Sequence, residues 1–340
     1  MNLTALNQIA SALVAPGKGL LAADESTGTI KKRFDDIGVE STLETRRDYR
    51  ELLFRTTDAL SDFISGVILY DETIWQGAAD GTPLIELITA AGAIPGIKVD
   101  KSTHPLPGFP GESITEGLDG LDERLAAYRA RGARFAKWRA AIDIGDGRPT
   151  AGAVRANAHA LARYAGLCQA NDIVPIVEPE VLMDGGHDID RCDEVTRFVL
   201  QSVFDALFEQ RVALEGMVLK PNMVISGMAS PTQAGVEEVA RRTIAALKAH
   251  VPAAVPGIAF LSGGQEDEEA TAHLNAMHRL GPLPWGLTFS YGRALQHAAQ
   301  QAWSGKAENV AAAQRAFAHR ARMNSLASLG QWEGGLEVAA

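Results

Sequence analysis

The chain has 340 residues, of which 46% are hydrophobic and 22% are charged, a balance typical of a globular protein with a large core. The formal net charge of −10 argues against a surface for nucleic acid or anionic membranes, so an anionic ligand would need a local cluster of cations. The two cysteines, Cys168 and Cys192, form no redox or metal motif. We find no signal peptide and no run of ~18 apolar residues, and we therefore expect a cytoplasmic protein.

Short apolar runs alternate with longer amphipathic patterns along the chain. The runs predict eight strands, at residues 19–25, 65–70, 94–100, 135–140, 173–180, 216–222, 257–263 and 285–291. Eight strands separated by helices predict an α/β protein in which one parallel sheet closes into a (β/α)8 TIM-type barrel. We expect residues 1–340 to form this single domain. An N-terminal helix and an alanine-rich stretch after Ser304 should pack outside the barrel, and a tail at about 330–340 should be mobile.

Several turn and cap residues mark where the helices begin and end. Ser41 and Glu44 have the spacing of a capping box, Asp188 is placed to cap a helix that follows it, and Gly132 is placed to end one. Residues 105–111 are rich in proline and glycine and predict a loop after the third strand.

The carboxyl ends of the predicted strands carry an unusual concentration of charge, and catalytic residues of such barrels lie at these ends. Side chains two residues apart share one face of a strand, so Lys137 and Arg139 point the same way, as do Glu178 and Glu180. A single ion pair would fit a purely structural network. Three lysines, one arginine and three acids over five strand ends are better explained by a functional cluster.

One of these lysines, Lys220, follows the apolar residues 217–219 and precedes Pro221. A salt bridge at a strand end would explain it. A lysine in an apolar setting is also a candidate nucleophile, because burial disfavours its charged form and a neutral amine can attack a carbonyl to form a Schiff base. Lys137 beside it would further favour the neutral form. The carboxylates available to move protons are Asp24, Glu178 and Glu180.

Two groups of residues predict anion sites on either side of this lysine. Ser262 and Gly263 precede a predicted helix, and the loops after the last two strands often bind phosphate in barrels of this kind. Arg293 could add a cation there. The second site is predicted at Ser26, Thr29, Arg33 and Lys98, although residues 31–33 could equally be a solvated helix face. The pattern suggests a carbonyl substrate with a phosphate at one or both ends, cleaved at a carbon–carbon bond. The eight histidines show no metal-ligand spacing, so we expect no metal.

Seven stretches of the chain resemble, in order, the motifs of class I fructose-1,6-bisphosphate aldolases. Among them are Leu219-Lys-Pro-Asn-Met223 and Phe260-Leu-Ser-Gly-Gly-Gln265. The others are residues 15–28, 96–101, 135–139, 173–180 and 287–295. The resemblance extends from about Ile9 to about Leu326. It implies reversible cleavage of fructose 1,6-bisphosphate to dihydroxyacetone phosphate and glyceraldehyde 3-phosphate in glycolysis and gluconeogenesis, without a cofactor, by what is commonly a homotetramer.

The resemblance also implies a role for each matched residue. Lys220 matches the Schiff-base lysine, Glu178 the general acid–base residue, Glu180 its carboxylate neighbour, Asp24 the acid that works on the carbinolamine and the cleaved bond, and Lys137 the assisting cation. The family positions that hold the phosphate nearer the ketone correspond to Ser262, Gly263, Ser290 and Arg293. The positions around the other phosphate and the sugar hydroxyls correspond to Ser26, Thr29, Arg33, Lys98 and Arg139.

Three questions stay open at this point. Animal members of the family carry a C-terminal tyrosine that helps proton exchange, whereas this sequence has no tyrosine after Tyr291, so we expect another group to serve or the exchange to be slower. The preferred substrate could be fructose 1-phosphate or sedoheptulose 1,7-bisphosphate. A non-catalytic scaffold that binds phosphosugars is the alternative outside enzymes.

Overall fold

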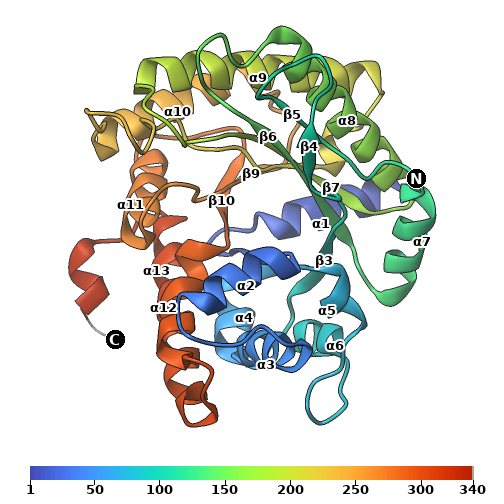
Figure 1. The fold of residues 1–340 in the computed structure, drawn as a ribbon, viewed down its shortest axis with the longest axis vertical. Coiled ribbons are helices and arrows are strands. Elements are labelled where there is room, and N and C mark those ends of the chain that lie inside the picture. Colours follow the sequence, from blue (N-terminus) through green and yellow to red (C-terminus); the bar gives the residue numbers. More distant parts are fainter. Residues whose placement is uncertain (339–340) are drawn as a thin grey trace.

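Eight parallel strands form a closed barrel in the computed structural model, which describes residues 1–338 (Figure 1). Around the barrel the strands follow the order β1-β10-β9-β8-β7-β6-β3-β2. Their bounds are β1 (Gly19–Ala23), β2 (Ile64–Leu69), β3 (Ile94–Lys98), β6 (Phe135–Ile142), β7 (Val174–Val181), β8 (Val218–Leu219), β9 (Gly257–Phe260) and β10 (Gly286–Tyr291). The prediction of eight strands and a TIM-type barrel is confirmed.

Helices surround the barrel and bury its outer face. In chain order they are α2 (Thr27–Asp35), α3 (Leu43–Phe54), α4 (Thr57–Phe63), α5 (Asp71–Trp75), α6 (Leu84–Ala90), α7 (Leu121–Arg131), α8 (Ala151–Ala170), α9 (Ile189–Glu209), α10 (Val236–His250), α11 (Asp267–His278), α12 (Arg293–Trp303) and α13 (Val310–Ala327), with 3-10 turns η1 (Leu214–Gly216), η2 (Ala307–Asn309) and η3 (Gly334–Val338). Their apolar faces and the outward side chains of the strands form one large core. Within residues 1–338, no helix is both long and apolar enough to cross a bilayer.

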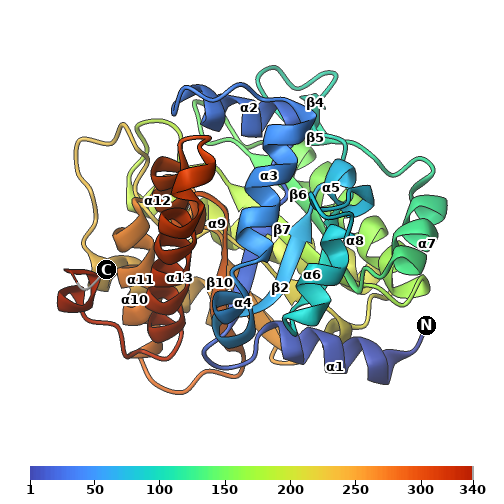
Figure 2. The same ribbon diagram turned by 90° about the horizontal axis from the view of Figure 1, so that it is seen from below.

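The first helix, α1 (Leu3–Leu13), lies across the end of the barrel where the strands begin. Figure 2 shows it at one end, with α2 at the opposite end. Its residues Leu6 and Leu13 join Phe135 and other inward side chains in a second core cluster inside the barrel. Gly96 provides the space for the Phe135 ring, since a Cβ atom there would lie 2.3 Å from it. The cluster fills this end of the barrel, and a cavity opens at the other end, where the strands end.

The predicted helix ends are confirmed except for one. Asp188 accepts a hydrogen bond from the Arg191 N–H at 2.9 Å, and Gly132 ends α7 with a left-handed φ of 119°.

The capping box predicted at Ser41 and Glu44 is wrong. The cap of α3 is Thr42, which exchanges hydrogen bonds with Thr45. The physical reason is that Ser41 is engaged elsewhere: its carbonyl and its hydroxyl both accept from Arg46 Nη1, at 3.1 and 3.3 Å. The helix therefore begins one residue later than the pattern predicted.

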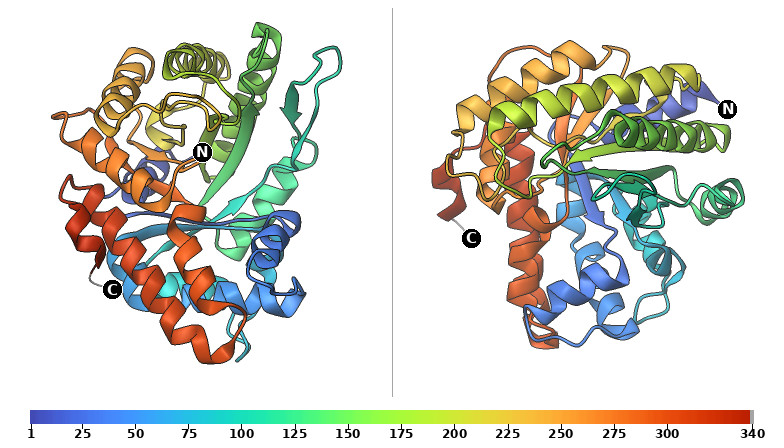
Figure 3. Two further views of the ribbon diagram at one scale, coloured as in Figure 1. Left: turned by 60° about the vertical axis from the view of Figure 1, so that its left-hand side comes forward. Right: turned by 45° about the horizontal axis from the view of Figure 1, so that its top comes forward.

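The loop predicted at residues 105–111 is the turn of a small hairpin. Its strands are β4 (Thr103–Pro105) and β5 (Ser113–Thr115), which pair antiparallel; the left view of Figure 3 shows the hairpin extending away from the barrel. β4 is exposed and ends in a proline, and so gives little of the alternating pattern by which a strand is recognised.

At the other end of the chain, Glu337 in η3 pairs with Arg320 of α13 at 2.6 Å. The mobility of the tail at 330–340 stays a prediction, and residues 339 and 340 lie outside the described part of the chain.

Candidate active site

A cavity of about 450 Å³ opens at the carboxyl end of the barrel strands. All fourteen site residues predicted from the sequence line it: Asp24, Ser26, Thr29, Arg33, Lys98, Lys137, Arg139, Glu178, Glu180, Lys220, Ser262, Gly263, Ser290 and Arg293. They come from seven of the eight barrel strands or the segments that directly follow them. The parallel arrangement explains this convergence, because every strand delivers its last residues to the same end of the barrel.

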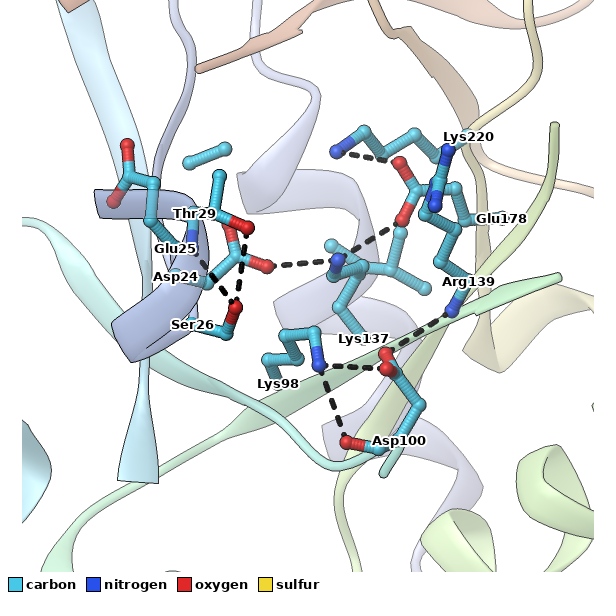
Figure 4. Close-up of polar contacts among 12 residues, drawn as sticks. Asp24, Glu25, Ser26, Thr29, Lys98, Asp100, Lys137, Arg139, Glu178 and Lys220 are labelled. Atoms are coloured by element: carbon cyan, nitrogen blue, oxygen red, sulfur yellow. Dashed lines mark hydrogen bonds and ion pairs between the residues drawn. The ribbon is translucent and has the colours of Figure 1, made fainter. Parts of the chain in front are cut away.

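Four charged side chains form a continuous chain of ion pairs on one wall of this cavity (Figure 4). Lys220 Nζ lies 2.8 Å from Glu178 Oε1, and Lys137 Nζ lies 3.1 Å from Glu178 Oε2. Lys137 Nζ also lies 2.7 Å from Asp24 Oδ2. Two acids and two bases thus alternate in the order Lys220, Glu178, Lys137, Asp24, which gives a short path along which protons can move.

Burial makes these interactions strong. Lys220 and Lys137 are each only 4% exposed, and Glu178 is 3% exposed. Burial by itself would raise the pKa of Asp24, but the nearby charges of Lys137 and Lys220 outweigh it and lower that pKa to about 2. The pKa of Glu178 is lowered in the same way, by Lys137 and Lys220 acting against burial. The pKa of Lys137 is raised well above its usual value because Asp24 and Glu178 outweigh the effect of burial. At neutral pH this row of ion-paired side chains therefore contains the carboxylates of Asp24 and Glu178 and the ammonium of Lys137.

The backbone register places these groups with little freedom. Arg139 on β6 is directly beside Glu178 on β7, and Lys98 on β3 is beside Lys137. Lys220 follows the last residue of β8, and its N–H still donates to the Val177 carbonyl at 2.8 Å. Rigid strands therefore hold these lysines and the Glu178 carboxylate, as a preorganised site requires.

Arg139 and Glu180 form a second ion pair in the cavity. This pair keeps Glu180 out of the row of ion pairs formed by Lys220, Glu178, Lys137 and Asp24, although Glu178 and Glu180 project from the same face of β7. The sequence predicts their common direction from the two-residue spacing, but it does not predict that each takes a different partner.

The phosphate site predicted after the last two strands is built around a tight turn. Gly264 has a φ of +74°, and a Cβ atom at Gly263 would lie 2.2 Å from Met183 Cε, so both positions need glycine. Ser290 Oγ is buried and has no hydrogen-bond partner among residues 1–338. Arg293, the first residue of α12, donates to the Gln265 carbonyl at 2.6 Å. The turn thus presents free backbone and hydroxyl donors to the cavity.

The opposite anion site is built on the first turn of α2. Ser26 caps this helix and accepts from the Thr29 N–H at 3.3 Å. Two of its cations are already paired with acids at neighbouring strand ends, since Arg33 forms an ion pair with Glu25 and Lys98 Nζ lies 2.6 Å from Asp100 Oδ1. The residues predicted for this site are together, but Arg33 and Lys98 have carboxylate partners that the prediction did not include.

Sequence reasoning missed several residues that line the cavity. They are Ala22, Glu25, Asp100, Ser102, Thr103, Leu261 and Gly292. Glu25 and Asp100 could have been found, because both lie at predicted strand ends next to residues that were chosen. Ser102 and Thr103 could not, because they reach the cavity only through the path of the chain into β4. Within the described residues, no group of three or more His, Cys, Asp or Glu side chains is placed to hold a metal ion.

Comparison with known proteins connects this geometry to a family. A family model described as glycolytic, fructose-bisphosphate aldolase class-I, matches residues 5–340. The chain is 58% identical over 335 residues to a probable fructose-bisphosphate aldolase class 1 of Xanthomonas axonopodis pv. citri, with 98% of this chain and all of the relative covered. It is 53% identical to fructose-bisphosphate aldolase C of Rattus norvegicus, over 97% of this chain and 91% of that protein.

A solved structure has the same fold. It is the fructose-bisphosphate aldolase of Plasmodium falciparum, determined in complex with TRAP and a small-molecule inhibitor. The TM-score is 0.96 at 50% sequence identity, and the match covers 98% of this chain and 96% of the other.

Proposed function

The chain belongs to the class I fructose-bisphosphate aldolase family, which cleaves fructose 1,6-bisphosphate in glycolysis through a Schiff base, and we propose that Lys220 is the amine that forms it. The observation that carries the proposal is the ion pair between Lys220 Nζ and Glu178 Oε1, at 2.8 Å inside a phosphosugar-sized cavity. A carboxylate at this distance can take a proton from the amine as it attacks the carbonyl carbon.

Formation of the Schiff base redistributes the three protons of the lysine ammonium. Glu178 takes one, and the free amine adds to the ketone carbon while the carbonyl oxygen develops negative charge. Lys137, 3.1 Å from the same carboxylate, supplies the positive charge beside that oxygen. The oxygen leaves as water with two of the protons, and one proton stays on the iminium nitrogen.

Asp24 is proposed as the base for carbon–carbon cleavage. It takes the proton from the hydroxyl on the carbon that becomes the aldehyde, and the electrons of the broken bond move to the iminium and give an enamine. Its low pKa keeps it ionised at neutral pH. Glyceraldehyde 3-phosphate leaves first. Protonation of the enamine carbon and hydrolysis of the iminium then release dihydroxyacetone phosphate and return the amine.

The substrate is proposed to lie between the two anion sites. Ser262, Gly263, Ser290 and Arg293 would hold the phosphate nearer the ketone, because they surround the tight turn on the Lys220 side. Ser26, Thr29, Arg33, Lys98 and Arg139 would hold the other phosphate and the hydroxyls. Glu25 and Asp100 would position Arg33 and Lys98, and both cations would exchange part of these contacts for the phosphate. The family is metal-independent, and no step above uses a cofactor.

The test is to replace Lys220 by alanine and to measure kcat/KM for fructose 1,6-bisphosphate cleavage. Because the covalent intermediate would be lost, we expect activity at least about 10⁴-fold below that of the original protein. Lys101→Ala, at an exposed lysine, is the matched control and should keep normal activity. Near-normal cleavage by Lys220→Ala would overturn the assignment.

The family resemblance further supports a homotetramer that works in the cytoplasm. Both cysteines are buried free thiols, which suits a reducing compartment. Light scattering after size exclusion would give the mass of the assembly, and cell fractionation its location. A monomer at working concentration would contradict the first expectation, and a secreted protein would contradict the second.

A further inference from the structure

Gln296 on α12 is a buried glutamine that contacts Glu25, the acid paired with Arg33 in the cavity wall. Its side chain is 0% exposed and does not line the cavity. Gln296 Nε2 donates to Glu25 Oε1 at 2.9 Å, and this is the same oxygen that forms the ion pair with Arg33. The proposed function gives parts to Arg33 and Glu25 but none to Gln296.

Three hydrogen bonds fix the orientation of the Gln296 amide. Besides the bond to Glu25, Nε2 donates to the Ala22 carbonyl at 2.7 Å, and the Tyr49 hydroxyl donates to Oε1 at 3.1 Å. A carbonyl and an ion-paired carboxylate only accept hydrogen bonds, so the amide nitrogen must face Ala22 and Glu25. The amide therefore always presents a donor, and never its oxygen, to Glu25.

The backbone of Glu25 is held by the helix that carries Tyr49. Arg50, the next residue of α3, is 1% exposed, and its Nη2 donates to the Glu25 carbonyl at 2.9 Å. The Glu25 side chain is itself only 4% exposed. Within residues 1–338, the donors to Glu25 Oε1 are Gln296 and Arg33. Loss of the Gln296 donor would therefore leave this buried oxygen to Arg33 alone.

Gln296 thereby decides how Glu25 acts on Arg33. With the amide in place, the carboxylate has a fixed position and divides its charge between two donors. Without the amide, the carboxylate would follow the guanidinium instead of holding it in one place, and it would have no other donor. Both changes make Arg33 less available to a phosphate in the cavity, because bidentate recognition of an anion needs a fixed guanidinium.

We propose that Gln296 is a positioning residue that sets the preference of the enzyme for sugar bisphosphates over sugar monophosphates. It acts through Glu25, which holds Arg33 at the place of the phosphate farther from the ketone. This role rests on the function proposed for the cavity, in which Arg33 binds that phosphate. A glutamine that only stabilised the packing of α3 and α12 would affect both classes of substrate alike.

The test compares kcat/KM for fructose 1,6-bisphosphate with kcat/KM for fructose 1-phosphate in Gln296→Met, which keeps the length of the side chain and removes both donors. We expect the ratio of the two values to fall at least about fivefold, mainly through a higher KM for the bisphosphate. Cleavage of fructose 1-phosphate should change less than about twofold, which also shows that the variant is folded.

Gln300→Met is the matched control. Gln300 is a buried glutamine one turn later on α12, and its Nε2 has no hydrogen-bond partner within residues 1–338. Its replacement should leave the ratio unchanged. If Gln296→Met does not fold, Tyr49→Phe takes its place, since it removes only the hydroxyl that orients the amide. It should lower the ratio at least about twofold.

A double variant shows whether the effect passes through Arg33. Arg33→Gln should itself lower the ratio, and adding Gln296→Met should lower it no further, because the guanidinium that Glu25 positions is then absent. The role of Gln296 is overturned if its replacement changes both substrates equally or neither, or if its effect persists in full beside Arg33→Gln. An unchanged ratio in Arg33→Gln would overturn both this role and the phosphate site proposed at Arg33, whereas an unchanged ratio in Gln296→Met alone overturns only the role of Gln296.

Discussion

Lys220 and Glu178 form a buried ion pair, with Nζ 2.8 Å from Oε1, and the other oxygen of the same carboxylate faces Lys137. One acid therefore serves two lysines. Glu178 orients the amine and balances its charge, and both side chains are buried. The proton must leave Lys220 before the amine can attack, and Glu178 is the group in contact to receive it.

Glu178→Gln removes this proton acceptor and keeps the shape of the side chain. We expect kcat to fall by about 10²–10⁴-fold, the usual contribution of a general acid–base residue. Rapid-mixing measurements should show that formation of the covalent intermediate is slowed. Glu116→Gln, at an exposed carboxylate outside the cavity, is the control. A Glu178→Gln enzyme that forms the intermediate at the normal rate would show that another group takes the proton.

The lowered pKa of Asp24 predicts that the free energy of unfolding depends on pH. Its pKa is about 2 in the folded protein, against an ordinary value of 3.8, because Lys137 and Lys220 outweigh burial. The unfolded chain therefore binds the proton first on acidification. The stabilisation that the Asp24 carboxylate gives to the folded protein is fully present above about pH 4 and is lost as the pH falls toward 2.

The measurement is urea unfolding of the original protein and of Asp24→Asn between pH 3 and pH 6. Because the variant lacks the titrating group, the difference between the two free energies of unfolding should shrink by about 1 kcal/mol on going from pH 6 to pH 3. A difference that stays constant over this range would mean that Asp24 has an ordinary pKa in the folded protein.

The helices and strands of this chain were largely predictable because their periodicity is strong. Each barrel strand is an apolar run, and helix caps such as Asp188 and Gly132 follow simple local chemistry. The capping box at Ser41 failed because a distant partner decided it: Arg46 reaches Glu72 at 2.6 Å and also bonds Ser41. Local patterns contain no information about such contacts.

The site residues were predicted because parallel strands deliver them to one place, but their pairing was not. An apolar setting suggested an uncharged Lys220, whereas the structure places the Glu178 carboxylate against it. The same limit applies to Glu25 and Asp100, which neutralise Arg33 and Lys98. Which acid meets which base depends on the tilt of the strands and on side-chain conformation as well as on register: Arg139 is aligned with Glu178, but it forms its ion pair with Glu180.

Replacing Arg33 is expected to change the preference of the enzyme between two substrates. If it binds the phosphate farther from the ketone, Arg33→Gln should lower kcat/KM for fructose 1,6-bisphosphate by about 10–100-fold, the value of one charged hydrogen-bonding contact. The value for fructose 1-phosphate, which lacks that phosphate, should change little. Lys32→Gln, at the exposed neighbouring cation of α2, should affect neither substrate. Equal losses for both substrates would place Arg33 outside the phosphate site.

The most direct test of the account is to trap the covalent intermediate. Purified protein is incubated with dihydroxyacetone phosphate and borohydride, which reduces an iminium to a stable amine, and the modified peptide is identified by mass spectrometry. We expect a single label on Lys220, loss of activity in proportion to labelling, and no label in Lys220→Ala. Unlabelled protein, or a label on Lys137 in the original protein, would contradict the central claim that Lys220 forms the Schiff base.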